Sequence, residues 1–172
     1  MKKVFLLLAI LILYSCGTSN YPPLDVVDSV DINRYIGKWY EIARMPFNQQ
    51  EGCSCTTAEY EIIDETTIKV INKCVKDGEL DDAMGKAFVV EGSNNAKLRV
   101  QFFWPFRGDY WVIELDKENY QYAVVGTPSR KYLWILSRTP QIGKELLEQL
   151  KEKISAKGFD VTKLLIIEQN CD

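Results

Sequence analysis

The chain has 172 residues, which suits a single domain, and 47% of them are hydrophobic, enough to build a core. It contains no histidine, which excludes Ser-His-Asp and Cys-His catalysis within this chain and removes the commonest metal ligand. The net charge of −3, with no strongly basic stretch, argues against nucleic acid as a partner, since phosphate binding needs a concentrated positive field. We therefore expect no metal and no cofactor.

The first residues have the pattern of a targeting segment. A positive start at residues 1–3 precedes an apolar run over residues 4–14, and a small residue and Cys16 follow. This order is typical of a secretory signal. The run is too short to span a bilayer comfortably, because a transmembrane helix needs about 20 apolar residues.

Residues 13–16, Leu-Tyr-Ser-Cys, resemble the lipobox of bacterial lipoproteins. The resemblance implies cleavage before the cysteine and a diacylglycerol on its thiol, and two or more acyl chains hold a protein stably on a membrane. Gly17 stands where many inner-membrane lipoproteins have aspartate, which favours the outer membrane. We expect a signal peptide at 1–15, a lipidated N-terminus and flexible tether at 16–30, and one domain at 31–172.

The body of the chain shows short strand patterns separated by turn residues. The run 97–104 is typical: Leu98, Val100 and Phe102 alternate with Arg99 and Gln101, as in a half-buried strand. Eight such strands at short spacing indicate an all-β sandwich or an up-and-down barrel. The expected strands are 38–45, 57–63, 67–72, 85–91, 97–104, 110–115, 120–126 and 132–138.

One helix follows the strands. Thr139 is a suitable N-cap, Pro140 suits the first helical position, and Lys157-Gly158 suits the end. Apolar residues recur at three- and four-residue steps from Ile142 to Ile154, which predicts a helix with one buried face against the outside of the sheet. A short last strand is expected at 163–168.

Four cysteines remain after Cys16, and an even number in an exported chain indicates disulfides. Cys53 and Cys55 are too close to bridge each other easily. A hairpin about residues 64–65 would bring Cys74 opposite Cys55 and near Cys53, so one of these two pairs with Cys74 and the other with Cys171. A metal site or a reactive thiol is the alternative, but no histidine is present to support either.

Two motifs resemble those of the lipocalin family. Residues 37–43, with Gly37, Trp39 and Tyr40, resemble the G-x-W-Y signature of the first lipocalin strand, and residues 133–140 resemble the last barrel strand with its arginine, Arg138. The resemblance covers about residues 30–172 and is greatest to bacterial outer-membrane lipoproteins and the apolipoprotein D branch. It implies an eight-stranded antiparallel up-and-down β-barrel, with one C-terminal α-helix outside, and with Arg138 lying across Trp39 at the closed end.

The same resemblance implies the disulfides and the ligand site. The apolipoprotein D branch bridges the positions of Cys55 and Cys171, which leaves Cys53 with Cys74. Alternation along the strands would turn the following side chains inward with Trp134: Tyr60, Asn72, Phe102, Tyr110, Val112, Tyr122 and Leu136. Glu114 shares the parity of Tyr110, so it points inward or faces solvent near the rim. The ligand residues carried over from the family are Tyr60, Asn72, Phe102, Tyr110, Trp134 and Leu136.

The expected function is binding and carriage of a small hydrophobic ligand, such as a fatty acid or lysophospholipid, by a lipid-anchored protein of the outer membrane that faces the periplasm. It is not expected to be an enzyme. The alternatives are an envelope protein with a filled core and no ligand, and a lipocalin-type enzyme. The aromatic segment 104–109 is expected at the rim of the barrel, where it would guard the mouth, contact lipid or form a homodimer contact.

Overall fold

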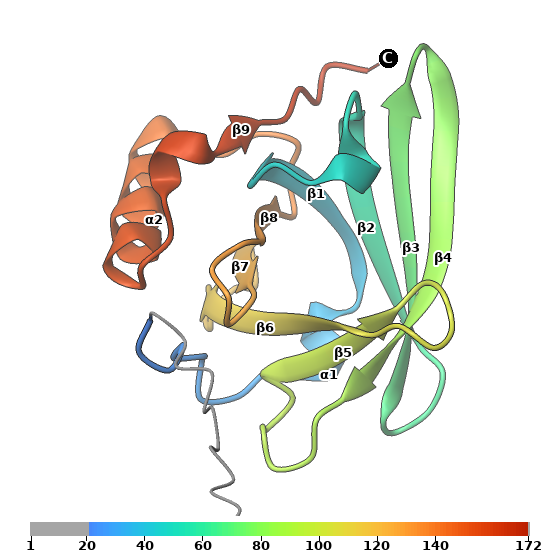
Figure 1. Ribbon diagram of the computed structural model, residues 1–172, viewed down its shortest axis with the longest axis vertical. Coiled ribbons are helices and arrows are strands. Elements are labelled where there is room, and N and C mark those ends of the chain that lie inside the picture. Colours follow the sequence, from blue (N-terminus) through green and yellow to red (C-terminus); the bar gives the residue numbers. More distant parts are fainter. Residues whose placement is uncertain (1–20, 172) are drawn as a thin grey trace, which may run out of the picture.

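The computed structural model describes residues 21–171, so the expected signal peptide and Cys16 lie outside the described residues. Eight antiparallel strands form a closed ring (Figure 1), because each pairs with its sequence neighbours and β1 pairs with both β2 and β8. This confirms the predicted barrel. The strands are β1 (Gly37–Arg44), β2 (Ser54–Ile62), β3 (Thr67–Lys76), β4 (Glu79–Val89), β5 (Lys97–Gln101), β6 (Gly108–Leu115), β7 (Tyr122–Gly126), β8 (Leu133–Ser137) and the added β9 (Leu165–Ile166). The helices are α1 (Ile32–Tyr35) and α2 (Lys144–Ala156), with short 3-10 turns η1 (Asn48–Gln50) and η2 (Val161–Lys163).

Two apolar cores lie on the two faces of this sheet. The inner core fills the lower barrel and includes Trp39, Leu98 and Val112. The outer core lies between the barrel and α2, where Leu150 and Ile154 of the helix are buried. The helix therefore packs against the outside of the barrel, as predicted from its apolar stripe (Figure 1).

The helix begins later than predicted. Its first residue is Lys144 and its N-cap is Gly143, without a side-chain cap. Thr139 instead donates its hydroxyl proton to the carbonyl oxygen of Gln141 at 2.7 Å. Thr139 therefore stabilises a turn and not the start of the helix. A threonine side chain can bond to nearby backbone groups in a turn as readily as at a helix N-terminus.

The β3–β4 hairpin is longer than predicted. Strand β4 begins at Glu79, six residues before the expected start, and β3 continues to Lys76. Asp77 and Gly78 both have positive φ, at 53° and 82°, which allows a two-residue turn that keeps the strands paired on either side. Cross-strand pairing thus overrides the low strand preference of the acidic residues that follow.

Register shifts interrupt the regular pairing at three places: between Glu41 and Ala43 on β1, between Ser54 and Thr57 on β2, and between Val112 and Glu114 on β6. The bulges on β1 and β6 each place two consecutive residues on the same face, so that side chains after the bulge point to the side opposite to simple alternation. The predicted strand over 97–104 also ends early, because β5 stops at Gln101 and a turn follows.

The start of the described chain lies along the barrel. Leu24 and Val30 are buried, the backbone N–H of Val27 donates to the carbonyl oxygen of Val112, and Arg130 donates to the carbonyl oxygen of Pro22. The expectation of a flexible tether up to residue 30 is therefore wrong for residues 21–30. Within residues 21–171, no helix is both long and apolar enough to cross a bilayer.

Candidate functional site

The base of the barrel is sealed by Trp39 and Arg138. The Cζ atom of Arg138 lies 3.8 Å from the centroid of the Trp39 ring, and this indole is fully buried. Arg138 donates to the carbonyl oxygen of Lys38 at 2.8 Å and to those of residues 34–36 at 2.7 to 3.1 Å. The Trp39 ring nitrogen donates to the carbonyl oxygen of Tyr35 at 2.8 Å. These bonds tie α1 across the closed end, which is the arrangement that the two sequence motifs implied.

Three tyrosines meet above this base. The Tyr110 hydroxyl lies 2.8 Å from that of Tyr35 and 2.9 Å from that of Tyr60. Burial raises the pKa of Tyr60 to about 12 and those of Tyr35 and Tyr110 well above their usual value. All three phenols are therefore neutral hydrogen-bonding groups at neutral pH. Tyr35 was not predicted to belong here, because it lies on a single helical turn before the first strand.

The six predicted ligand residues lie on the inner face at different depths. Tyr60 and Leu136 are nearest the base and only 3% exposed. Tyr110 and Trp134 face inward but are half-buried, and Phe102 packs against the inner core beside Gly85. Asn72 pairs directly opposite Ala58, another residue of the inner face, and is also half-buried. Exposure of the inner face thus increases from the closed base toward the open end.

A buried polar cluster lies beside Trp134, toward the open end. Glu41 and Arg44 form an ion pair at 2.7 Å and are each 3% exposed. Gln50 donates to Glu41 at 2.8 Å, accepts from the Trp134 ring nitrogen at 2.9 Å, and accepts at its backbone carbonyl from Arg44. Burial raises the pKa of Glu41, although Arg44 acts to lower it. Within residues 21–171, Arg44 Nε is buried and has no hydrogen-bond partner.

This cluster was missed by sequence reasoning. Glu41 shares the parity of Trp39, so alternation alone could have placed it inside. Arg44 has the opposite parity, and only the bulge after Glu41 turns it inward. Gln50 comes from the loop after β1, and loops carry no strand periodicity from which its direction could be read.

Two predicted orientations are wrong. Tyr122 packs in the outer core against α2, while its neighbours Ala123 and Val125 face inward. Glu114 does not point into the barrel or toward the rim, because it pairs with Lys153 at 3.1 Å and Lys157 at 3.4 Å on and just after α2. The bulge on β6 explains Glu114, since Tyr110 and Val112 keep the expected inward direction and the residues after them do not.

Two disulfides hold the start of β2. Cys53 is bridged to Cys74, with their Cα atoms 5.5 Å apart, and Cys55 is bridged to Cys171, with a Cα distance of 6.1 Å. This is the pairing that the family resemblance implied. The second bridge holds the last described residue beside the barrel, where the backbone N–H of Cys55 also donates to the carbonyl oxygen of Glu168.

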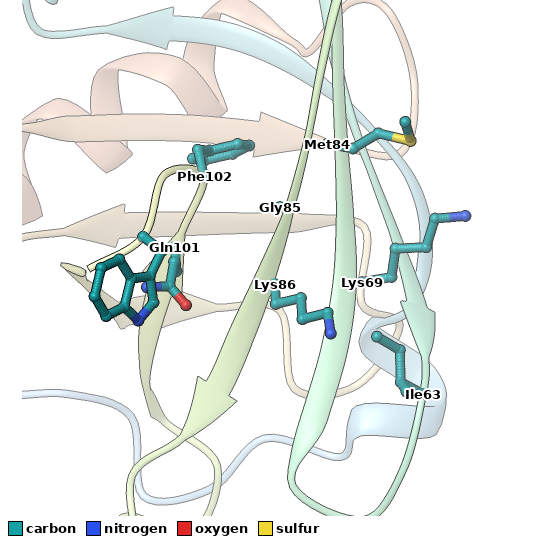
Figure 2. A pocket seen from close by; sticks show the side chains of 8 residues that line it. Ile63, Lys69, Met84, Gly85, Lys86, Gln101 and Phe102 are labelled. Atoms are coloured by element: carbon teal, nitrogen blue, oxygen red, sulfur yellow. The ribbon is translucent and has the colours of Figure 1, made fainter. Parts of the chain in front are cut away.

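A separate groove lies where β5 leaves β4. Strand β4 pairs with β5 only from Lys86 onward, so its earlier residues have a free edge on that side. The groove has a volume of about 440 Å³, and Figure 2 shows the side chains around it. A Cβ atom on Gly85 would lie 2.7 Å from the Gln101 carbonyl oxygen and 2.8 Å from the Phe102 ring, so both residues approach the β4 backbone closely at the inner boundary of the groove. The residues that line it are Ile63, Lys69, Met84, Gly85, Lys86, Gln101, Phe102 and Trp104.

An eight-stranded barrel with a Trp–Arg seal, a packed lower interior and an outer helix defines the class of small up-and-down barrels that lipocalins represent. The family model described as "Lipocalin-like domain" matches residues 30–169. The chain therefore belongs to the lipocalin family.

Named relatives cover almost the whole chain. Outer membrane lipoprotein Blc of Vibrio cholerae is 40% identical over 98% of this chain and 99% of its own length. Outer membrane lipoprotein Blc of Escherichia coli K12 is 39% identical over 94% and 92%. Apolipoprotein D of Bos taurus is 33% identical over 92% and 86%. Among solved structures, insecticyanin of the tobacco hornworm Manduca sexta matches the fold with a TM-score of 0.71, 23% identity and coverage of 86% and 85%.

Proposed function

We propose that this chain is a lipid-anchored outer-membrane lipocalin that binds and carries a small hydrophobic ligand in the cell envelope and performs no chemistry on it. The observation that carries the proposal is the gradient inside the barrel. The base is sealed by Trp39 under Arg138, whereas Phe102, Tyr110 and Trp134 face inward and are still partly exposed. A closed apolar base and an accessible aromatic upper wall suit a ligand that enters from the open end.

The chemistry of the wall favours an amphipathic ligand with one acyl chain, such as a fatty acid or a lysophospholipid. The apolar lower part suits the chain. Gln50 is partly exposed near the open end, where the ligand's polar head would meet it, and it is held in place by the buried Glu41–Arg44 pair. Asn72 lies on the inner face of β3 and adds a further amide to the wall.

The N-terminus and the relatives support the proposed location. Two relatives at about 40% identity carry the name outer membrane lipoprotein. This chain has Cys16 at the end of a lipobox-like segment and Gly17 after it. We propose diacylation of Cys16 and attachment to the outer membrane, with the barrel on the periplasmic side.

The ligand proposal is tested by replacing one tryptophan on each face of the barrel by alanine. Trp134→Ala removes an inward ring, and Trp111→Ala removes an outward one that packs in the outer core under Lys97. Affinity for a lysophospholipid or fatty acid, measured by native mass spectrometry, should fall at least tenfold for Trp134→Ala and stay unchanged for Trp111→Ala. A tenfold loss corresponds to about 1.4 kcal/mol.

Two results would contradict the proposal. One is equal ligand affinity for the wild type and Trp134→Ala. The other is a barrel that takes up no lipid of any class, together with a loss of about 3–5 kcal/mol of stability in Trp134→Ala, which is the behaviour of a filled core. The second result would favour the structural alternative.

A further inference from the structure

The loop between β5 and β6 exposes three aromatic side chains, Phe103, Trp104 and Phe106, which we call the aromatic tip. They are 78%, 86% and 77% exposed. The loop is held in shape, because the backbone N–H of Phe106 donates to the carbonyl oxygen of Phe103 at 2.9 Å and Arg107 stacks on the Phe88 ring at 4.1 Å. Exposed rings clustered on an ordered loop indicate a contact surface rather than scattered apolar residues.

Positive charge lies beside the aromatic tip. Lys86 lines the adjacent groove (Figure 2), to which Trp104 of the tip also contributes, and Arg107 follows the tip directly. Neither side chain forms an ion pair within residues 21–171. Aromatic rings next to unpaired cations match the boundary between acyl chains and anionic headgroups, where tryptophan is enriched and basic residues are attracted.

The described chain begins at the same end of the barrel as the aromatic tip. Arg130 belongs to the β7–β8 loop, which lies at the open end together with the β5–β6 loop. Its Nη2 donates to the carbonyl oxygen of Pro22 at 2.8 Å, and its Cζ lies 5.2 Å from the Tyr21 ring centroid. Cys16 precedes Tyr21 by five residues, which span at most about 18 Å. With lipid on Cys16, as proposed above, Tyr21 and the β7–β8 loop that it contacts stay near the membrane.

We propose that the aromatic tip inserts into the interfacial layer of the bilayer that holds the anchor, so that the mouth of the barrel lies against lipid. Lys86 and Arg107 then lie at the headgroups. The β3–β4 hairpin, which carries Asp77, Glu79 and Asp81, also belongs to the open end by strand order, but its tip projects toward the top of Figure 1, away from both the β5–β6 loop and the start of the chain. These carboxylates can therefore stay in water while the aromatic tip is buried.

A bilayer fits this surface better than a second copy of the chain. A stable protein interface buries roughly 800 Å² on each partner and needs a broad complementary face. The aromatic tip is a single projecting loop of three rings, with Lys86 and Arg107 beside it, while the nearby carboxylate of Asp109 is paired with Arg99. Insertion of a few rings beside a lipid anchor needs no complementary partner surface.

Quenching by brominated lipid tests the proposal directly. The full-length lipidated protein is placed in vesicles of phosphatidylethanolamine and phosphatidylglycerol with brominated acyl chains, and tryptophan fluorescence is measured. Brominated lipid should quench the wild type, and Trp104→Phe should lose most of that quenching. Trp111→Phe, a matched change on the side of the barrel, should keep it. Equal quenching of the wild type and Trp104→Phe overturns the proposal.

Separate readouts distinguish this proposal from the anchor and from ligand binding. The mass of the mature protein reports lipid on Cys16, and native mass spectrometry reports the bound ligand. If Cys16 carries no lipid, the unlipidated protein is floated with the same vesicles. The proposal is overturned if the protein floats and serine substitutions at all three positions of the aromatic tip do not reduce its flotation. Self-association that these serine substitutions abolish, without quenching by brominated lipid, also overturns it in favour of a second copy.

Discussion

Replacing Arg138 by alanine should destabilise the barrel by about 3 kcal/mol. The guanidinium makes five hydrogen bonds to backbone carbonyl oxygens, those of residues 34–36, Lys38 and Tyr120. Arg138 is half-buried, so water replaces part of each bond, and we take the low value of about 0.5 kcal/mol for each. The cation over the Trp39 ring adds about 0.5–1 kcal/mol. For a domain of this size, the melting temperature should fall by roughly 6–12 °C.

The assay is urea unfolding followed by tryptophan fluorescence, with Arg99→Ala as the matched control. Arg99 forms a surface ion pair with Asp109 at 2.9 Å, and such pairs contribute about 0–1 kcal/mol. Arg138→Lys should fall between Arg138→Ala and the wild type, because one ammonium group cannot reach all five carbonyl oxygens. The reasoning is refuted if Arg138→Ala loses no more stability than Arg99→Ala.

Two further perturbations probe other parts of the barrel. Gly126→Ala would place a Cβ atom 2.7 Å from Phe159 in the outer core and should lower the free energy of unfolding in urea by about 1–3 kcal/mol. Gly143→Ala is the control, because its Cβ atom meets nothing within 4 Å. Equal stability of the two variants would disprove the predicted clash. The pKa of Tyr60 is raised to about 12 in the folded state, so stability should be full below about pH 10 and fall by about 2–3 kcal/mol as the pH rises to about 12. Tyr60→Phe should reduce this alkaline loss, and an unchanged pH profile of unfolding would count against it.

The closed end and the general fold were predictable because their signals are local and redundant. Gly37, Trp39 and Arg138 belong to two motifs, and the strands around them alternate over several residues. The helix was predictable from its apolar stripe, since Leu150 and Ile154 are one turn apart. Its start was not, because Thr139 can cap a turn as well as a helix.

Along β1 and β6, the directions of the side chains were predictable only as far as the bulge. Tyr110 and Val112 point inward as alternation requires, but the bulge that follows sends Glu114 outward to Lys153. No residue type at this position indicates a bulge in the sequence, because the place of the bulge is set by the curvature that the barrel needs to close. The same limitation hid Arg44 on β1.

Closure of the barrel must follow the formation of its local hairpins when this chain folds. The residues that complete the barrel, Lys38 and Arg138, are 100 positions apart and meet through a hydrogen bond. Pairing of β1 with β8 requires the whole span between them, so it is the slowest contact to form from an extended chain. With export as proposed above, β1 crosses the membrane before β8. The ring then cannot close until both strands are on the same side.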